Sequence, residues 1–214
     1  MIAPEGKIIL IPLLLLIIAG VGIQAWQPLP LLKWINLLLA ILTLFSLYFF
    51  RDPPRPPLNK SGFLSPADGK IVQIINVEDP EIGKAKQISI FLSVFNVHSQ
   101  RVAENGRVIW KKHHLGKFLA AFNHKASQDN EQTEVLFETN KGEKYKIKQI
   151  AGLIARRIIN YMEADNLVQR GQRLGFIRFG SRVDIIVPHD FQITVSLGDV
   201  VSGNQHIIGS FHED

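Results

Sequence analysis

Two apolar stretches near the N-terminus constrain the fold more than any other feature of this 214-residue chain. Ile8 to Ala25 and Trp34 to Phe50 carry no formally charged side chain, and each is close to the roughly 17 to 25 residues that a membrane-spanning helix needs. A cleaved signal peptide is disfavoured, because the second stretch follows the first almost at once. The sequence predicts a membrane-anchoring helical hairpin over residues 1–50, either spanning or shallow, with buried helices of a soluble core as the alternative.

The basic residues around these stretches predict their orientation. Lys7 precedes the first stretch, and only Lys33 lies between the two. The cations after the second stretch are Arg51, Arg55 and Lys60. Because positive charge favours the cytoplasmic side, both ends are expected there, at the cell membrane. The net charge of +5 fits anionic lipid at least as well as nucleic acid, and no nucleic-acid partner is expected, since no basic stretch is interleaved with aromatic residues. The three cations either contact lipid phosphates or only set the topology.

The rest of the chain reads as β-rich. Residues 51–62 are dense in proline, which ends a helix, and we interpret them as a linker to a domain over 63–214. Short β-branched or aromatic runs separated by turn residues predict strands at 70–78, 87–95, 133–139, 144–152, 175–179, 182–187 and 191–197. Helices are expected at 116–130 and 153–165, although the second suits a strand equally well. The predicted class is α+β, with a β-sandwich-like catalytic domain, a few short helices and no long repeat.

Three polar residues are candidates for chemistry, since the chain has no cysteine. Asp68 lies in a turn signal, His98 ends a very apolar run, and Ser181 follows Gly180 inside a stretch that reads as a β-hairpin over 175–188. Each residue alone has a plain structural role. Together they are the types that make an oriented base and an activated hydroxyl.

A metal site is not expected, because the adjacent His113 and His114 cannot lie on one face of a helix or strand.

Several motifs occur in one order along nearly the whole chain. They are "FFRDPPR", "SPADGKI", "FNVHSQRV", "KASQDNEQTEV", "QIAGLIARRI" and "GFIRFGSRVDIIVP". In these the chain resembles the short, bacterial-type phosphatidylserine decarboxylase proenzymes. "NVHSQR" and "NEQ" depart from the usual "NVHVNR" and "NER", which affects expected substrate contacts more than the reaction.

The resemblance implies a self-cleaving, pyruvoyl-dependent enzyme that converts phosphatidylserine to phosphatidylethanolamine and carbon dioxide. The cut falls between Gly180 and Ser181 and leaves a β chain of residues 1–180 and an α chain of residues 181–214. Ser181 becomes the pyruvoyl cofactor, which forms a Schiff base with the substrate, while His98 matches the base and Asp68 the acid that orients it. The second Gly-Ser pair, Gly209 and Ser210, lacks the surrounding motif and is not expected to be cut.

Other interpretations remain open from the residues alone. A membrane-anchored lipoyl-like or adaptor domain would share "SPADGKIV", but such carriers present a lysine commonly beside methionine, and neither Met1 nor Met162 adjoins a lysine. A serine hydrolase would keep Ser181 intact. Within the family resemblance, archaetidylserine is an alternative substrate, and a homodimer is a plausible assembly.

Overall fold

The computed structural model describes residues 1–116, 129–152, 157–178 and 181–211. It divides the chain into two compact units, Met1–Pro54 and Arg55–Asp214, and each is considered by itself.

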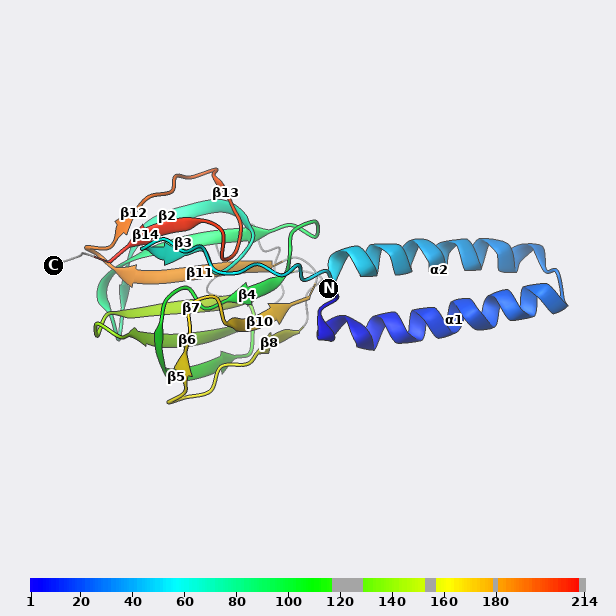
Figure 1. Cartoon of the computed structure of the whole chain (residues 1–214), viewed down its shortest axis with the longest axis horizontal. Coiled ribbons are helices and arrows are strands. Elements are labelled where there is room, and N and C mark those ends of the chain that lie inside the picture. The colour runs from blue at the N-terminus through cyan, green and yellow to red at the C-terminus, as the bar shows by residue number, and fades with distance from the viewer. Residues whose placement is uncertain (117–128, 153–156, 179–180, 212–214) are drawn as a thin grey trace. The chain divides into compact units, whose positions relative to one another are not determined.

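The first unit is a helical hairpin (Figure 1). A short 3-10 turn, η1 (Pro4–Gly6), leads into α1 (Lys7–Trp26), and α2 (Pro30–Phe49) returns. The helices approach closely at Gly20, where an added Cβ would lie 2.1 Å from Oδ1 of Asn36. At the open end, the Asp52 amide donates to the Met1 carbonyl at 2.8 Å. The hairpin is thus closed by backbone bonds as well as by helix packing.

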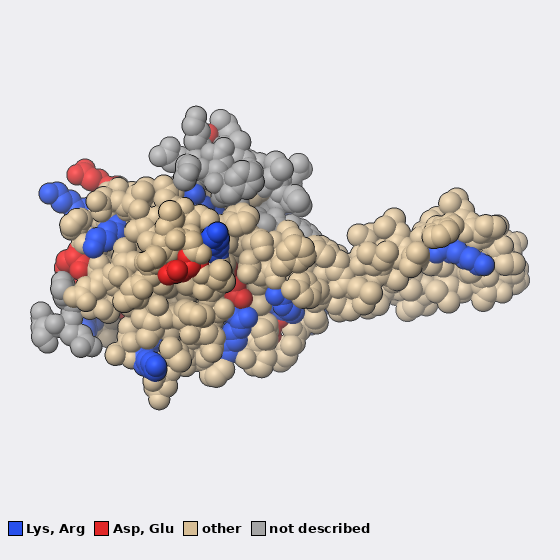
Figure 2. Space-filling model, turned by 90° about the horizontal axis from the view of Figure 1, so that it is seen from above, with Lys and Arg blue, Asp and Glu red and all other residues tan. Residues whose placement is uncertain are grey.

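The hairpin exposes an apolar surface. Both helices are long and apolar enough to cross a membrane, and only 11% of each apolar window is buried. On the face shown in Figure 2 the hairpin is almost free of charged side chains, whereas blue and red residues are spread over the other unit. A soluble core helix would be mostly buried, so the observed exposure favours a lipid environment. Lys33 lies within α2, not in the turn as expected from the sequence.

The second unit is built on one large antiparallel sheet. Over the described residues its strand order is β13-β2-β3-β11-β7-β6-β5-β9. Their bounds are β2 Gly69–Asp79, β3 Gly83–Leu92, β5 Gly106–His114, β6 Gln132–Thr139, β7 Lys144–Ala151, β9 Leu167–Val168, β11 Ser181–Pro188 and β13 Val200–Val201. Figure 1 shows β11 running between β3 and β7 through the middle of this sheet.

Two smaller antiparallel sheets complete the unit, in the orders β1-β14-β12 and β4-β10-β8. Their strands are β1 Phe63–Leu64, β4 Ser99–Arg101, β8 Ile158–Asn160, β10 Arg173–Ile177, β12 Gln192–Ile193 and β14 Ile207–Ser210. The apolar core draws on all three sheets, with alternate residues of the large sheet, such as Val183 and Ile185 of β11, on its core face. Side chains of β11 between them lie on the opposite face.

The strand pairing repeats within the unit. One half contains β4 to β10, and the other contains β1 to β3 together with β11 to β14. The strands pair in the same pattern within each half, and the halves are joined where β7 pairs with β11. Single hydrogen bonds also recur: the Gly203 amide donates to Oδ1 of Asp68 at 2.8 Å, and the Arg170 amide to Oδ1 of Asn105 at 2.9 Å. The two halves therefore share a pattern of strand pairing, although the sequence contains no long repeat.

The predicted class, apolar helices followed by a β-rich domain, is confirmed. The expected hairpin over 175–188 is wrong, because β10 pairs with β4 and β8 while β11 pairs with β3 and β7. In the candidate helix at 153–165, residues 158–160 form β8. The candidate at 116–130 lies mostly outside the described residues. β5 was not predicted, because its exposed end is a run of consecutive polar side chains, Lys111 to His114.

Candidate active site

Ser181 is the first residue of β11, the central strand of the large sheet. It lies opposite Leu92 of β3 and Ala151 of β7, and its side chain is on the core face with that of Val183. The residue is 0% exposed, and among the described residues its Oγ has no hydrogen-bond partner. A buried hydroxyl without a hydrogen-bond partner destabilises the folded state. Such groups occur where a side chain has a catalytic role.

His98 is also 0% exposed and precedes β4. The Ile177 amide of β10 donates to its carbonyl at 3.4 Å, so His98 lies beside the end of the strand that leads towards Ser181. Nδ1 of the imidazole is 2.9 Å from the Asn96 carbonyl. Since a carbonyl only accepts hydrogen bonds, Nδ1 carries the proton in the neutral ring, and Nε2 is left as the basic nitrogen.

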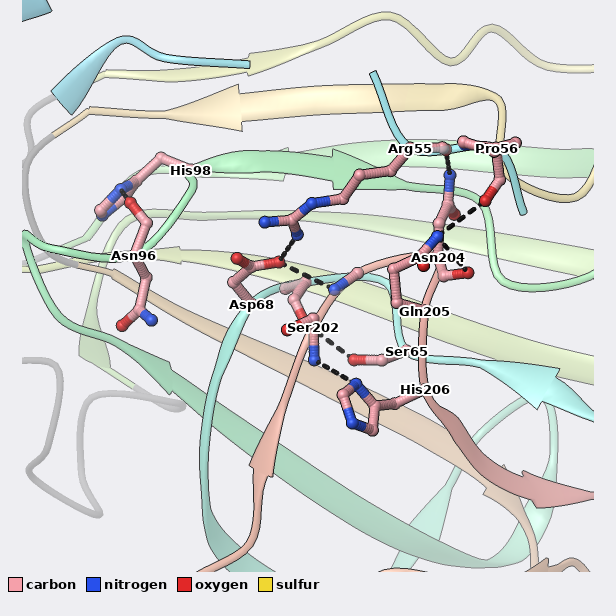
Figure 3. A network of polar contacts seen from close by, with 12 residues as sticks. Arg55, Pro56, Ser65, Asp68, Asn96, His98, Ser202, Asn204, Gln205 and His206 are labelled. Carbon is pink, nitrogen blue, oxygen red and sulfur yellow. Dashed lines mark hydrogen bonds and ion pairs between the residues drawn. The ribbon is translucent and has the colours of Figure 1, made fainter. Parts of the chain in front are cut away.

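Asp68 lies in the turn between β1 and β2 and is 7% exposed. Its carboxylate accepts a hydrogen bond from the Arg55 guanidinium, in an ion pair, and another from the Gly203 amide. Figure 3 shows the Arg55 side chain reaching along this network to Asp68, with His98 and Asn96 at one end of the view. Among the described residues these are the partners of Asp68, and no hydrogen bond joins it to His98.

Arg55 is anchored at its backbone too. Nδ2 of Asn204 donates to the Arg55 carbonyl at 3.1 Å, and Nε2 of Gln205 donates to the Pro56 carbonyl at 2.8 Å (Figure 3). Of the cations considered for lipid contacts, Arg55 therefore has a carboxylate partner inside the unit, while Arg51 contacts the Tyr48 carbonyl and ring.

The internal repeat separates two roles of Asp68. Asn105 occupies the equivalent place in the other half and accepts the equivalent amide bond, here from Arg170. A neutral amide side chain can therefore hold this turn. The turn itself therefore does not require the charge of Asp68, and in the described structure the charged partner of Asp68 is Arg55.

The remaining candidates are placed as follows. Gly180 lies outside the described residues. Gly209 is within β14, where an added Cβ would be 2.2 Å from the Phe191 ring, so this glycine has a packing role. His113 contacts Thr133 and Glu131, whereas His114 contacts Glu134. Among the described residues, no three histidine or acidic side chains form a group that could hold a metal ion.

Arg182 and Asp184 form a buried ion pair on the face of β11 opposite Ser181. Nε of Arg182 is 2.6 Å from Oδ1 of Asp184, and both side chains are at most 1% exposed. Nη2 of Arg182 also donates to Oε1 of Gln73 and Oγ of Ser89, at 2.5 and 2.6 Å. This pair therefore fixes the first residues of β11 on the face of the sheet away from Ser181, and Arg182 does not point into the site.

The sequence analysis missed Asn96, Gln100 and Gln149 around His98. Gln149 could have been noticed, because the alternation of β7 places Tyr145, Ile147, Gln149 and Ala151 on the core face, and a glutamine there needs partners.

A buried serine at the start of a central strand and a buried histidine on a segment bonded to β10 are the residue types that an enzyme with an activated hydroxyl uses. Comparison with known sequences narrows this class. The profile of the phosphatidylserine decarboxylase family matches residues 42–209. Phosphatidylserine decarboxylase proenzymes of Cupriavidus metallidurans and Pelobacter propionicus are 45% and 44% identical, over 82% and 80% of this chain and 82% and 79% of their own lengths.

The chain belongs to the phosphatidylserine decarboxylase family. The resemblance seen in the motifs and the enzyme class expected from it are thereby confirmed.

Proposed function

We propose that this chain cuts itself between Gly180 and Ser181 and acts as a pyruvoyl-dependent decarboxylase of phosphatidylserine at the membrane. One observation carries the proposal: Ser181 is fully buried, its Oγ has no partner among the described residues, and it begins the strand that follows the His98-bonded end of β10. Family membership supports the reaction, and the relatives are named as proenzymes.

In the proposed cleavage, Ser181 Oγ attacks the Gly180 carbonyl carbon. Nε2 of His98 takes the hydroxyl proton, a role open to it because Nδ1 is engaged by the Asn96 carbonyl. The peptide C–N bond breaks as the serine nitrogen takes a proton, which leaves an ester. Loss of the Cα proton then breaks the ester Cβ–O bond, giving a carboxylate at Gly180 and a dehydroalanine. Water converts the dehydroalanine to pyruvoyl and ammonia.

The surroundings of Ser181 fit the pyruvoyl group. Because Oγ of Ser181 has no hydrogen-bond partner among the described residues, loss of the hydroxyl breaks no hydrogen bond there. β11 is held by β3 and β7, both of which precede the cut. The two chains therefore stay associated without the β10–β11 pairing that the sequence suggested.

The pyruvoyl group supplies a ketone for the substrate amine and an adjacent carbonyl that withdraws electrons as carbon dioxide leaves. His98 is the group placed to return a proton to the substrate Cα. By the family resemblance we assign Asp68 to the acid that supports His98; in the described structure its partners are Arg55 and the Gly203 amide.

The apolar hairpin suits a substrate that resides in the bilayer. A diacyl lipid leaves the membrane rarely, since each buried methylene contributes about 0.8 kcal/mol. Both exposed helices can hold the enzyme where the headgroup is, with the β-rich unit on the cytoplasmic side as the flanking cations predict.

Intact-mass analysis of the purified full chain tests the cleavage. We expect a separate chain of residues 181–214 bearing a carbonyl at its N-terminus, and a single 24.1 kDa species for Ser181→Ala and His98→Ala. Ser210→Ala is the matched control, because it alters the other Gly-Ser pair and should leave the cut intact. An uncut wild-type chain that still releases carbon dioxide from phosphatidylserine vesicles would refute the proposal.

A further inference from the structure

A line of hydrogen-bonded amides ends at His98. The Met162 amide donates to Oδ1 of Asn160 at 2.9 Å, and Nδ2 of Asn160 donates to Oε1 of Gln149 at 2.7 Å. Nε2 of Gln149 donates to Oε1 of Gln100 at 2.9 Å, and Nε2 of Gln100 donates to the His98 carbonyl at 2.8 Å. Every member donates in the same direction, so the orientation of each amide is fixed by its neighbours.

Gln149 is the member that joins the two sheets. It belongs to β7 of the large sheet, lies opposite Val183, and is two residues before the Ala151 that faces Ser181. Its partners Gln100 and Asn160 belong to β4 and β8 of a small sheet, where they flank β10. Gln149 and Gln100 are both 0% exposed, so these amide bonds form in an apolar core where a lost partner is costly.

Gly175 of β10 makes the crossing possible. It pairs with Gln100 on one side and Asn160 on the other. A Cβ at this position would lie 2.7 Å from Nε2 of Gln149 and 2.1 Å from the Ile159 carbonyl. Because glycine leaves this space open, the Gln149 amide can lie over β10 and also donate to the Ile159 carbonyl at 3.3 Å.

We propose that Gln149 is a positioning residue for self-cleavage, holding the His98 segment in register with the strand that begins at Ser181. The inference rests on the proposed function. Nucleophile and base come from different sheets, since Ser181 begins β11 and His98 precedes β4. Gln149 connects the two sheets: it lies on β7, which pairs with β11, and its side chain bonds Gln100, which bonds the His98 carbonyl. Small misplacements of such groups slow a reaction strongly.

Gln149→Met tests this in the full chain, because methionine keeps the length and removes both donor and acceptor. The measurement is the rate constant of self-cleavage in newly synthesised precursor, followed across pH. We expect the rate to rise with pH through one titration, as in the wild type, because His98 remains the base. Its high-pH plateau should be lower by about tenfold or more, the change that about 1.4 kcal/mol of barrier produces.

Gln87→Met is the matched control. Gln87 is a buried glutamine of β3, which pairs with the other edge of β11, and it bonds Ser89 on the opposite face of the sheet. Its variant should keep the wild-type plateau even if it loses a similar amount of thermal stability. Equal slowing in both variants, or a Gln149→Met plateau within about twofold of wild type, would overturn the inference.

Asn160→Ala provides a second variant at the half-buried end of the line, should Gln149→Met fail to fold. It leaves Gln149 without its donor and should slow cleavage by a smaller factor; an unchanged rate would count against the inference. If the wild-type chain itself stays uncut, the proposed function fails; if only the variants behave as wild type, the positioning role alone fails.

Discussion

The buried pair of Arg182 and Asp184 offers a quantitative test of how β11 is held. Asp184→Leu would leave a fully buried guanidinium beside Gln73 and Ser89 without its carboxylate. Removing one partner of a buried ion pair costs about 3–5 kcal/mol. For a unit of this size, 1 kcal/mol shifts the unfolding midpoint by about 2–4 °C, so we expect Asp184→Leu to lower the midpoint by about 6–20 °C.

The double variant Arg182→Met with Asp184→Leu should recover most of that loss, because apolar replacement of the whole pair is often neutral. Thermal unfolding of the full chain in detergent, followed by circular dichroism of the β-structure, measures both variants against their parent. The parent is Ser181→Ala, which avoids mixing cut and uncut protein. A single variant that loses less than about 1 kcal/mol, or a double variant that loses more than the single one, would refute the interpretation that this pair is held by mutual neutralisation.

Two further predictions concern Asp68 and the Asp79–Lys146 pair. Asp68→Asn should keep the turn, as Asn105 holds the equivalent one, and lose only the ion pair with Arg55. We expect it to cut itself about tenfold more slowly or worse; a wild-type rate would assign Asp68 to the turn alone. Burial opposes both charges of the second pair. The 2.7 Å bond between them nevertheless holds the pKa of Asp79 below its ordinary value, and this bond together with the bond to Glu81 holds the pKa of Lys146 above its ordinary value. The pair should therefore contribute its full stability between pH 3.8 and pH 10.5, the unfolded-state pKa values of Asp79 and Lys146. This contribution should be lost as the pH falls below the first value or rises above the second. Lys146→Met should remove about 3 kcal/mol at neutral pH, and an equal effect of this substitution at pH values far below the lower limit would contradict the assignment.

The sequence by itself determined the local elements of this protein. Uncharged runs long enough for helices predict α1 and α2, since composition and length decide that property without any partner. Alternating apolar residues likewise predict β2, β6, β7 and β11 close to their observed bounds. The candidates Asp68, His98 and Ser181 were visible as residue types in suggestive places and through the family motifs that contain them.

Only the tertiary structure decided which strands are neighbours. The period of a strand shows which face is buried but not what pairs with its edges, so the stretch around Gly180 and Ser181 reads as a hairpin although β10 and β11 belong to different sheets. The bond from the Gly203 amide to Asp68 and the bridge from Gln149 to Gln100 join residues far apart in the chain. Such contacts arise from long-range packing, which local patterns in the sequence do not encode.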